Sequence, residues 1–176
     1  MLAEGIEPEF SFIIHPSEIT DKTVKFELSA ESDECAALAE RFGLQAIEFF
    51  ESVLTVRFLR REKAIGLRGK LRAKVIQSCV VSMAPVESLI EEEFEILFHD
   101  ENQIDRDELD DVVQFEPYSN DLIDIGEVAS EELALALDPY PRSPEIADEV
   151  LGPYLPEPED SAMKPFAALA ALKRNK

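Results

Sequence analysis

The sequence predicts an α+β domain built on an antiparallel β-sheet, and three observations lead to that fold class. Apolar and polar residues alternate over several segments, which is the period of half-buried strands. Other segments carry apolar residues at helical spacing between residues typical of helix ends. The chain has 176 residues, of which 45% are hydrophobic, and this suits one domain with a buried core. The pattern leaves open the strand order and whether the sheet closes partly into a barrel.

The first part of the chain switches between the two periods. Residues 10–14 (FSFII) form a short apolar run that a proline ends, and residues 23–28 (TVKFEL) alternate, so both are predicted to be strands. The period then changes, and a helix is predicted over 32–42. Ser32 or Asp33 can cap its start, and a glycine follows its last residue.

Three long strands are predicted next, over residues 44–61, 64–80 and 86–98. The second has small and apolar residues on one face and a basic residue at every other position on the opposite face. These cations lie about 7 Å apart, because a strand rises about 3.3 Å per residue. The third carries glutamates on one face. The two rows consist of Arg68, Lys70, Arg72 and Lys74, and of Glu87, Glu91, Glu93 and Glu95.

The C-terminal part is predicted to be less regular. Residues 99–121 are acidic and lack apolar periodicity, which indicates an exposed loop. Helices are predicted over 125–137 and 165–173, giving about three helices in all. The sequence thus divides into an α+β core domain over 1–137 and an extended, acidic, Pro-rich region over 138–176, whose short final helix packs on the core.

Composition excludes several classes of protein. No apolar run is long enough for a transmembrane helix, and the first ten residues lack the features of a secretory signal. Cys35 and Cys79 do not form a disulfide framework, so reduced thiols in a cytoplasmic protein are expected. The net charge of −21 argues against general coating of nucleic acid, although it permits a local basic site.

Positive charge is concentrated in one window between Arg57 and Lys74, which has eight basic residues and one acid and therefore a net charge of +7. Two interpretations remain open. The basic row can pair with the glutamate row of the next strand across an antiparallel ladder. Alternatively, it can face solvent and contact nucleic acid or protein.

Catalytic and metal-binding patterns are nearly absent. The two histidines, His15 and His99, have no nucleophile in their sequence context, and no phosphate-binding glycine loop or metalloprotease motif occurs. The carboxylates of residues 105–111 lack the glycine and the spacing of a calcium loop. We therefore expect no enzymatic activity, no cofactor and no metal.

Three segments, in order, resemble one family. They are GLRGKLRAKVIQSCVVSMAPVE (66–87), IDIGEVASEELALALDPYPR (123–142) and KPFAALAALK (164–173). Together they resemble the YceD family of large ribosomal RNA subunit accumulation proteins. The resemblance implies a cytoplasmic bacterial factor needed for accumulation of 23S rRNA and for assembly of the large ribosomal subunit. The residues that carry it are Cys79, Pro85, Asp124, Gly126, Glu127, Glu131, Leu133 and Leu135.

One departure from the family pattern concerns metal. Many members carry a CxxC motif where this chain has Cys79-Val80-Val81-Ser82, and a second cysteine cluster after the Pro-rich turn. Here Ser82 replaces the second cysteine, and no cysteine follows Cys79. A zinc site with four thiolates therefore cannot form in this chain.

Two hypotheses of function follow, and neither involves catalysis. In the first, the basic face contacts rRNA phosphates of 23S rRNA or of a pre-50S particle. In the second, the chain is an acidic adaptor that binds a basic ribosomal protein without touching RNA. Neither requires a membrane or a small-molecule substrate. The candidate RNA-binding residues are Arg57, Arg60, Arg61, Arg68, Lys70, Arg72 and Lys74.

Overall fold

A computed structural model describes residues 8–101 and 115–144, and all structural statements below concern these residues. Seven strands and two α-helices are formed, with one short 3-10 helix, η1. The elements in chain order are β1 (Ile13–Ile14), η1 (Pro16–Glu18), β2 (Val24–Ser29), α1 (Ser32–Phe42), β3 (Ala46–Leu59), β4 (Ala64–Ser78), β5 (Pro85–Asp100), β6 (Phe115–Tyr118), β7 (Ile123–Asp124) and α2 (Ile125–Ala136).

The main sheet has five strands in the order β2-β3-β4-β5-β6, and β1 pairs with β7 in a separate two-stranded sheet. The α+β class and the antiparallel pairing of the long strands are confirmed. The main sheet is open, because β2 and β6 lie at its two ends and do not pair with each other. One expectation needs correction, since β5 and β6 pair in parallel, through Leu97–Asp100 and Phe115–Tyr118.

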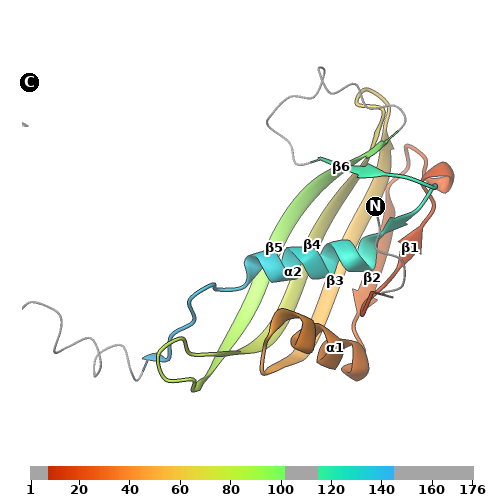
Figure 1. Ribbon diagram of the computed structural model, residues 1–176. Coiled ribbons are helices and arrows are strands. Elements are labelled where there is room, and N and C mark those ends of the chain that lie inside the picture. The colour runs from red at the N-terminus through yellow and green to blue at the C-terminus, as the bar shows by residue number, and fades with distance from the viewer. Residues whose placement is uncertain (1–7, 102–114, 145–176) are drawn as a thin grey trace, which may run out of the picture.

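Both α-helices lie on one side of the main sheet, as Figure 1 shows: α2 crosses the long strands, and α1 packs near one end. We call this side the inner face. Its strand residues form the core with both helices and with Phe10, and Leu38, Phe50, Leu71 and Leu133 are almost fully buried there. The opposite side, the outer face, is covered by neither helix.

The long strands follow the alternation in the sequence. On β4, every second residue from Ile65 to Gln77 is buried, while the basic residues between them are exposed or half-buried. Gly69 belongs to the buried set. A Cβ atom there would lie 2.1 Å from the ring of Phe94, so this glycine leaves room for an aromatic side chain of the neighbouring strand. The β4 register is continuous through Gly69, so the glycine makes no bulge.

Two of the three predicted helices are confirmed with small changes. Helix α1 has the predicted bounds, but its N-cap is Glu31 and not Ser32 or Asp33. Glu31 and Glu34 each bind the other's backbone N–H in a capping box. Gly43 follows with φ of 66°, the left-handed conformation that glycine adopts readily. Helix α2 ends at Ala136, one residue earlier than predicted.

Other boundaries differ more. The predicted strand over 10–14 is reduced to β1, because Phe10 and the two residues after it contact α2 in place of a sheet. The loop predicted over 99–121 was wrong at both ends, where β5 continues to Asp100 and β6 forms beside it. Strand β6 is stabilised by its parallel pairing with β5, and its own sequence has no alternation that would predict a strand. The helix predicted over 165–173 lies outside the described residues, as does most of the segment 138–176.

Candidate functional site

The basic row of β4 stands in the middle of the outer face. Antiparallel pairing places Arg68, Lys70 and Arg72 directly opposite glutamates of β5. The same cations lie opposite Thr55, Val53 and Glu51 of β3 on the other side. The row is thus flanked by a strand on each side and projects away from both helices.

All four β4 cations form ion pairs, and we call this set the charge ladder. Arg68 binds Glu95 at 2.9 Å, Lys70 binds Glu93 at 2.8 Å and Arg72 binds Glu91 at 2.8 Å. Lys74 lies between two carboxylates, Glu48 at 2.8 Å and Glu87 at 3.2 Å. The interpretation that the two rows pair across the sheet is therefore confirmed.

The ladder changes the electrostatics of the outer face. Four cations meet five carboxylates, so the ladder has a net charge of −1. The hydrogen bond from Lys70 to Glu93 raises the pKa of the lysine and lowers the pKa of the glutamate, so both groups stay charged. A polyanion that approaches the middle of this face meets alternating charges and not a positive ridge.

The cations at the β3–β4 end behave differently. Arg60 binds Asp21 at 2.7 Å. Arg57 and Arg61, by contrast, form no ion pair with any carboxylate of residues 8–101 and 115–144, and neither does Lys63 of the same turn. Among the described residues, the cations of the basic window that lack a carboxylate partner therefore lie only beside the turn between β3 and β4. We call this part of the sheet the β3–β4 end.

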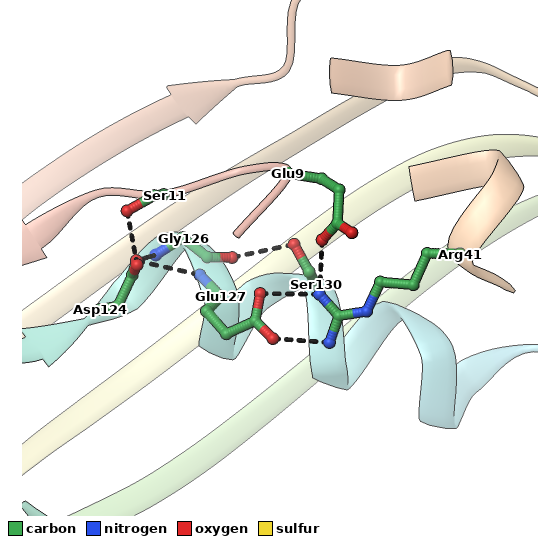
Figure 2. Close-up of polar contacts among 7 residues, drawn as sticks. All are labelled: Glu9, Ser11, Arg41, Asp124, Gly126, Glu127 and Ser130. Atoms are coloured by element: carbon green, nitrogen blue, oxygen red, sulfur yellow. Dashed lines mark hydrogen bonds and ion pairs between the residues drawn. The ribbon is translucent and has the colours of Figure 1, made fainter. Parts of the chain in front are cut away.

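The most specific motif residues lie on the other side of the sheet, at the start of α2 (Figure 2). The carboxylate of Asp124 caps α2 by accepting hydrogen bonds from the backbone N–H groups of Gly126 and Glu127, both at 3.1 Å. The same carboxylate accepts from the Phe12 N–H at 2.8 Å and from the Ser11 hydroxyl. Asp124 is thus the N-cap of α2, and it also ties the N-terminal segment to this helix.

Gly126 and Glu127 extend this contact. A Cβ atom on Gly126 would lie 2.7 Å from the Phe12 backbone nitrogen and 2.9 Å from the Phe10 carbonyl oxygen, so only glycine lets the two backbones approach. Glu127 binds both terminal nitrogens of Arg41 on α1, at 2.9 and 2.6 Å.

Arg41 also binds Glu9, at 2.9 Å. These carboxylates raise the pKa of its guanidinium, chiefly through the bond to Glu127. We call Asp124, Gly126, Glu127, Arg41, Glu9 and Ser11 the clamp, because it joins α1, α2 and the N-terminal segment.

The remaining motif residues have varied environments. Leu133 is fully buried in the core, whereas Leu135 is 74% exposed. Glu131 lies on α2, where burial and nearby Glu127 raise the pKa of its carboxyl despite the opposing effect of Arg41. Pro85 begins β5 at an exposed position. Leu133 thus serves packing of the core, whereas Pro85 and Leu135 are exposed.

Cys79 lies in the β4–β5 turn and is fully buried. Its sulfur accepts a hydrogen bond from the backbone N–H of Ser143 at 3.4 Å, which joins the segment after α2 to the turn. The Ser82 hydroxyl and the backbone N–H groups of Ser143, Ser82 and Val81 lower the pKa of the thiol to about 6. The cysteine thus has a structural part in holding the two segments together.

Several of these partners escaped the sequence analysis. Arg41, Glu9 and Ser11 were not singled out, because local patterns do not report contacts of this kind. Arg41 lies 86 residues from Glu127, Ser11 lies 113 residues from Asp124, and Glu9 lies 32 residues from Arg41. None of these contacts has the i, i+4 spacing that signals an ion pair within one helix. Glu48 was also missed, because it lies at an irregularity in the β3 register between Ile47 and Phe49.

Two features are absent from residues 8–101 and 115–144: a cluster of metal-ligating side chains and a helix that could span a membrane. No group of three or more histidine, cysteine, aspartate or glutamate side chains is arranged to hold a metal ion there. None of its helices is both long and apolar enough to cross a membrane.

Comparison with known proteins identifies the family. A family model described as "Large ribosomal RNA subunit accumulation protein YceD" matches residues 67–173, which is more than half of the chain and includes most of β4, Cys79 and all of α2. No curated protein and no solved structure matches. The order of the three motif segments and the family model agree, and the chain belongs to the YceD family.

Proposed function

We propose that this chain is a non-enzymatic factor that supports accumulation of 23S rRNA and assembly of the large ribosomal subunit in the cytoplasm. The observation that carries this proposal is the family match over residues 67–173. The structure adds that Asp124, Gly126 and Glu127, the most specific motif residues, are engaged in the clamp. A catalytic role would require these residues to give up those contacts.

The test of this proposal is genetic. Depletion of the protein should lower the ratio of 23S to 16S rRNA and reduce large subunits in a gradient, and the intact chain should restore both. An unchanged rRNA ratio after full depletion would remove the proposal. A matched pair of variants, Leu133→Ala and Leu135→Ala, separates loss of the folded protein from loss of an exposed contact, because only Leu133 is buried.

For the mode of action, the charge ladder favours the adaptor. The cations that would meet RNA phosphates are already paired, and the ladder as a whole is slightly negative. With 38 acidic and 17 basic residues, the chain as a whole suits a basic partner such as a ribosomal protein. After nuclease treatment, affinity capture of the protein should retain a ribosomal protein. If nuclease treatment removed every ribosomal protein from the captured material together with the RNA, that result would contradict the adaptor mode.

Direct RNA contact is a second candidate, and one observation favours it. Arg57, Arg61 and Lys63 at the β3–β4 end make no ion pair with a carboxylate of the described residues, so they can meet phosphates without first leaving a partner. Each phosphate contact steepens the salt dependence of binding by about one unit in a log–log plot. A contact that uses two of them predicts a slope of about −2, and one that uses all three about −3.

The two ends of the basic window can be compared in one binding titration with a 23S rRNA fragment. The variant Arg57→Gln/Arg61→Gln should weaken binding and lower the salt slope, whereas Lys70→Gln/Arg72→Gln should change little, because those cations are paired. Glutamine is used since a new glutamate at position 70 or 72 would face Glu93 or Glu91 across the ladder. Equal affinity and slope for both variants and the parent chain would exclude RNA contact through this window.

A further inference from the structure

A hollow of about 180 Å³ opens on the outer face at the β3–β4 end, beside the Arg68–Glu95 pair of the charge ladder. Side chains of three neighbouring strands line it, together with Thr23, which precedes β2. The polar and charged residues around it are Thr23, Thr55, Arg57, Arg68 and Glu95. The hollow is therefore large enough for several water molecules or for one small polyatomic ion.

Gly66 makes room at the edge of this hollow. It lies directly opposite Arg57 of β3 and Leu97 of β5, and because it has no side chain, the Leu59 side chain packs over its backbone. A Cβ atom at Gly66 would come within 2.8 Å of the Leu59 Cδ1 atom, and Leu59 is itself part of the lining. Any side chain at this position would therefore push Leu59 into the hollow or fill it directly.

Two arginines face this space from adjacent strands. Arg57 and Arg68 are diagonal neighbours in the register, because Arg57 pairs with Gly66 and Thr55 pairs with Arg68. Diagonal neighbours have their side chains about 7–8 Å apart, so one small anion can lie between the two guanidinium groups. The Thr55 hydroxyl donates to the Arg68 carbonyl oxygen at 3.3 Å, which ties the two strands at this point.

The two guanidinium groups are only partly used. Arg57 has no ion-pair partner in the described part of the chain, and Arg68 binds Glu95 through Nε at 2.9 Å. A guanidinium has five N–H donors, so the terminal nitrogens of Arg68 can still donate to another acceptor. Glu95 offsets one of the two positive charges, which leaves Arg57, Arg68 and Glu95 with a net charge of +1.

We propose that this hollow seats one phosphate group between Arg57 and Arg68. A phosphate presents oxygens on several sides, so guanidinium groups from two strands can bind it at once, whereas a carboxylate offers only two oxygens. The inference deepens the direct-RNA candidate, because it names the group that this end of the sheet binds. It depends on that candidate only for the source of the phosphate, an RNA backbone or a free phosphate.

The experiment titrates the full chain with inorganic phosphate at pH 7 and follows backbone amide signals by NMR. Sodium acetate at equal ionic strength is the control for simple anion screening. Signals of Thr55, Gly66 and Arg68 should shift in a saturable way with phosphate and not with acetate. Absence of a saturable shift, or an equal response to acetate, would overturn the proposal.

Four variants sharpen the result. Arg57→Gln should weaken phosphate binding about tenfold, since it removes a charge-assisted bidentate contact. Glu95→Gln should strengthen it about fivefold, because a repelling charge at short range is lost. Gly66→Ala should weaken it without changing any charge. Lys74→Gln, at the opposite end of the ladder, should leave it unchanged. An Arg57→Gln protein that binds as tightly as the parent chain would overturn the proposal.

The source of the phosphate is decided by competition. A 23S rRNA fragment that displaces inorganic phosphate and shifts the same signals assigns the site to an RNA backbone. If phosphate saturates the hollow and the RNA leaves these signals unchanged, the site takes a free phosphate, and RNA contact through the hollow fails while the phosphate site stands. RNA binding that persists without any phosphate response at the hollow would remove the site and leave the RNA candidate intact.

Discussion

The two sides of the main sheet use charge in opposite ways. On the outer face, the first three pairs of the charge ladder keep between 47 and 73% of their side-chain surface exposed. On the inner side, Arg41 of the clamp and its partners Glu127 and Glu9 keep 32, 24 and 23%. Exposed ion pairs contribute little to stability, whereas breaking a more buried pair leaves a charge without a partner.

The most conspicuous pattern in the sequence is therefore not the feature on which the fold depends most. The basic row of β4 is the most conspicuous pattern in the chain, yet its cations are neutralised by the neighbouring strand. The clamp, built from single residues such as Gly126 and Arg41, joins three segments that are distant in the sequence. We therefore expect stability to depend on the inner side, and phosphate binding to depend on the unpaired end of the outer face.

The largest effect should come from the core beneath the clamp. Leu133 is fully buried, so Leu133→Ala should lower the free energy of unfolding by about 2–5 kcal/mol. Leu135 lies two residues away and is 74% exposed, so Leu135→Ala should change it by less than about 0.5 kcal/mol. Denaturant unfolding monitored by circular dichroism measures both. Similar losses for the two variants would contradict the assigned orientation of α2.

A second test concerns the close approach at Gly126. Replacement of a helical glycine by alanine normally stabilises a helix by up to about 1 kcal/mol. Here the added methyl group meets backbone atoms of Phe10, Ser11 and Phe12 that cannot move aside, so Gly126→Ala should destabilise the protein by about 1–3 kcal/mol. The sign of the change in the denaturation midpoint decides the matter. A stabilised variant would show that the N-terminal segment does not pack on α2.

The pH dependence of Glu116 gives a third, smaller effect. Burial raises the pKa of this carboxyl on β6, and Glu131 and Glu132 add to the rise. The folded state then holds the proton more readily than the unfolded chain, whose value is about 4.5. The charged carboxylate therefore opposes folding at neutral pH, and this opposition disappears as the pH falls through the folded pKa.

Glu116→Gln should accordingly raise the melting temperature at pH 7 and make no difference near pH 4. Glu93→Gln is the control on the outer face. The hydrogen bond from Lys70 lowers the pKa of Glu93, so its contribution has the opposite sign and is lost as the pH falls. If Glu116→Gln lowered the melting temperature at pH 7, the charged form of Glu116 would have an attractive partner, and the comparison between the two sides would need revision.

The smallest effect is expected within the charge ladder. A double-mutant cycle of Arg72→Gln and Glu91→Gln should give a coupling of about 0.2–1 kcal/mol in low salt. It should largely vanish in 1 M salt, where charges are screened over about 3 Å. The corresponding cycle of Arg41→Gln and Glu127→Gln should give a larger value that salt reduces less. Equal couplings would remove the contrast between the two sides of the sheet.

Much of the local structure could be predicted from the sequence. Strict alternation on β4 separates buried leucines from exposed cations, and helix α1 has its predicted bounds, because both signals depend on residues close together in the chain. The pairing of the basic and acidic rows was foreseen as one of two possibilities, since consecutive strands usually pair in antiparallel hairpins. Alternation could not decide between them, because it gives the face of a side chain and not its partner.

What the sequence determined by itself was the three long strands with their faces, the helices α1 and α2, and the family, all of which follow from short-range patterns and motif order. Only the tertiary structure decided which charges remain unpaired, how β6 joins the sheet in parallel, and why Gly126 is required beside Phe12. These features depend on segments far apart in the chain meeting at van der Waals or hydrogen-bond distance. Spacing along one strand or helix carries no information about such meetings.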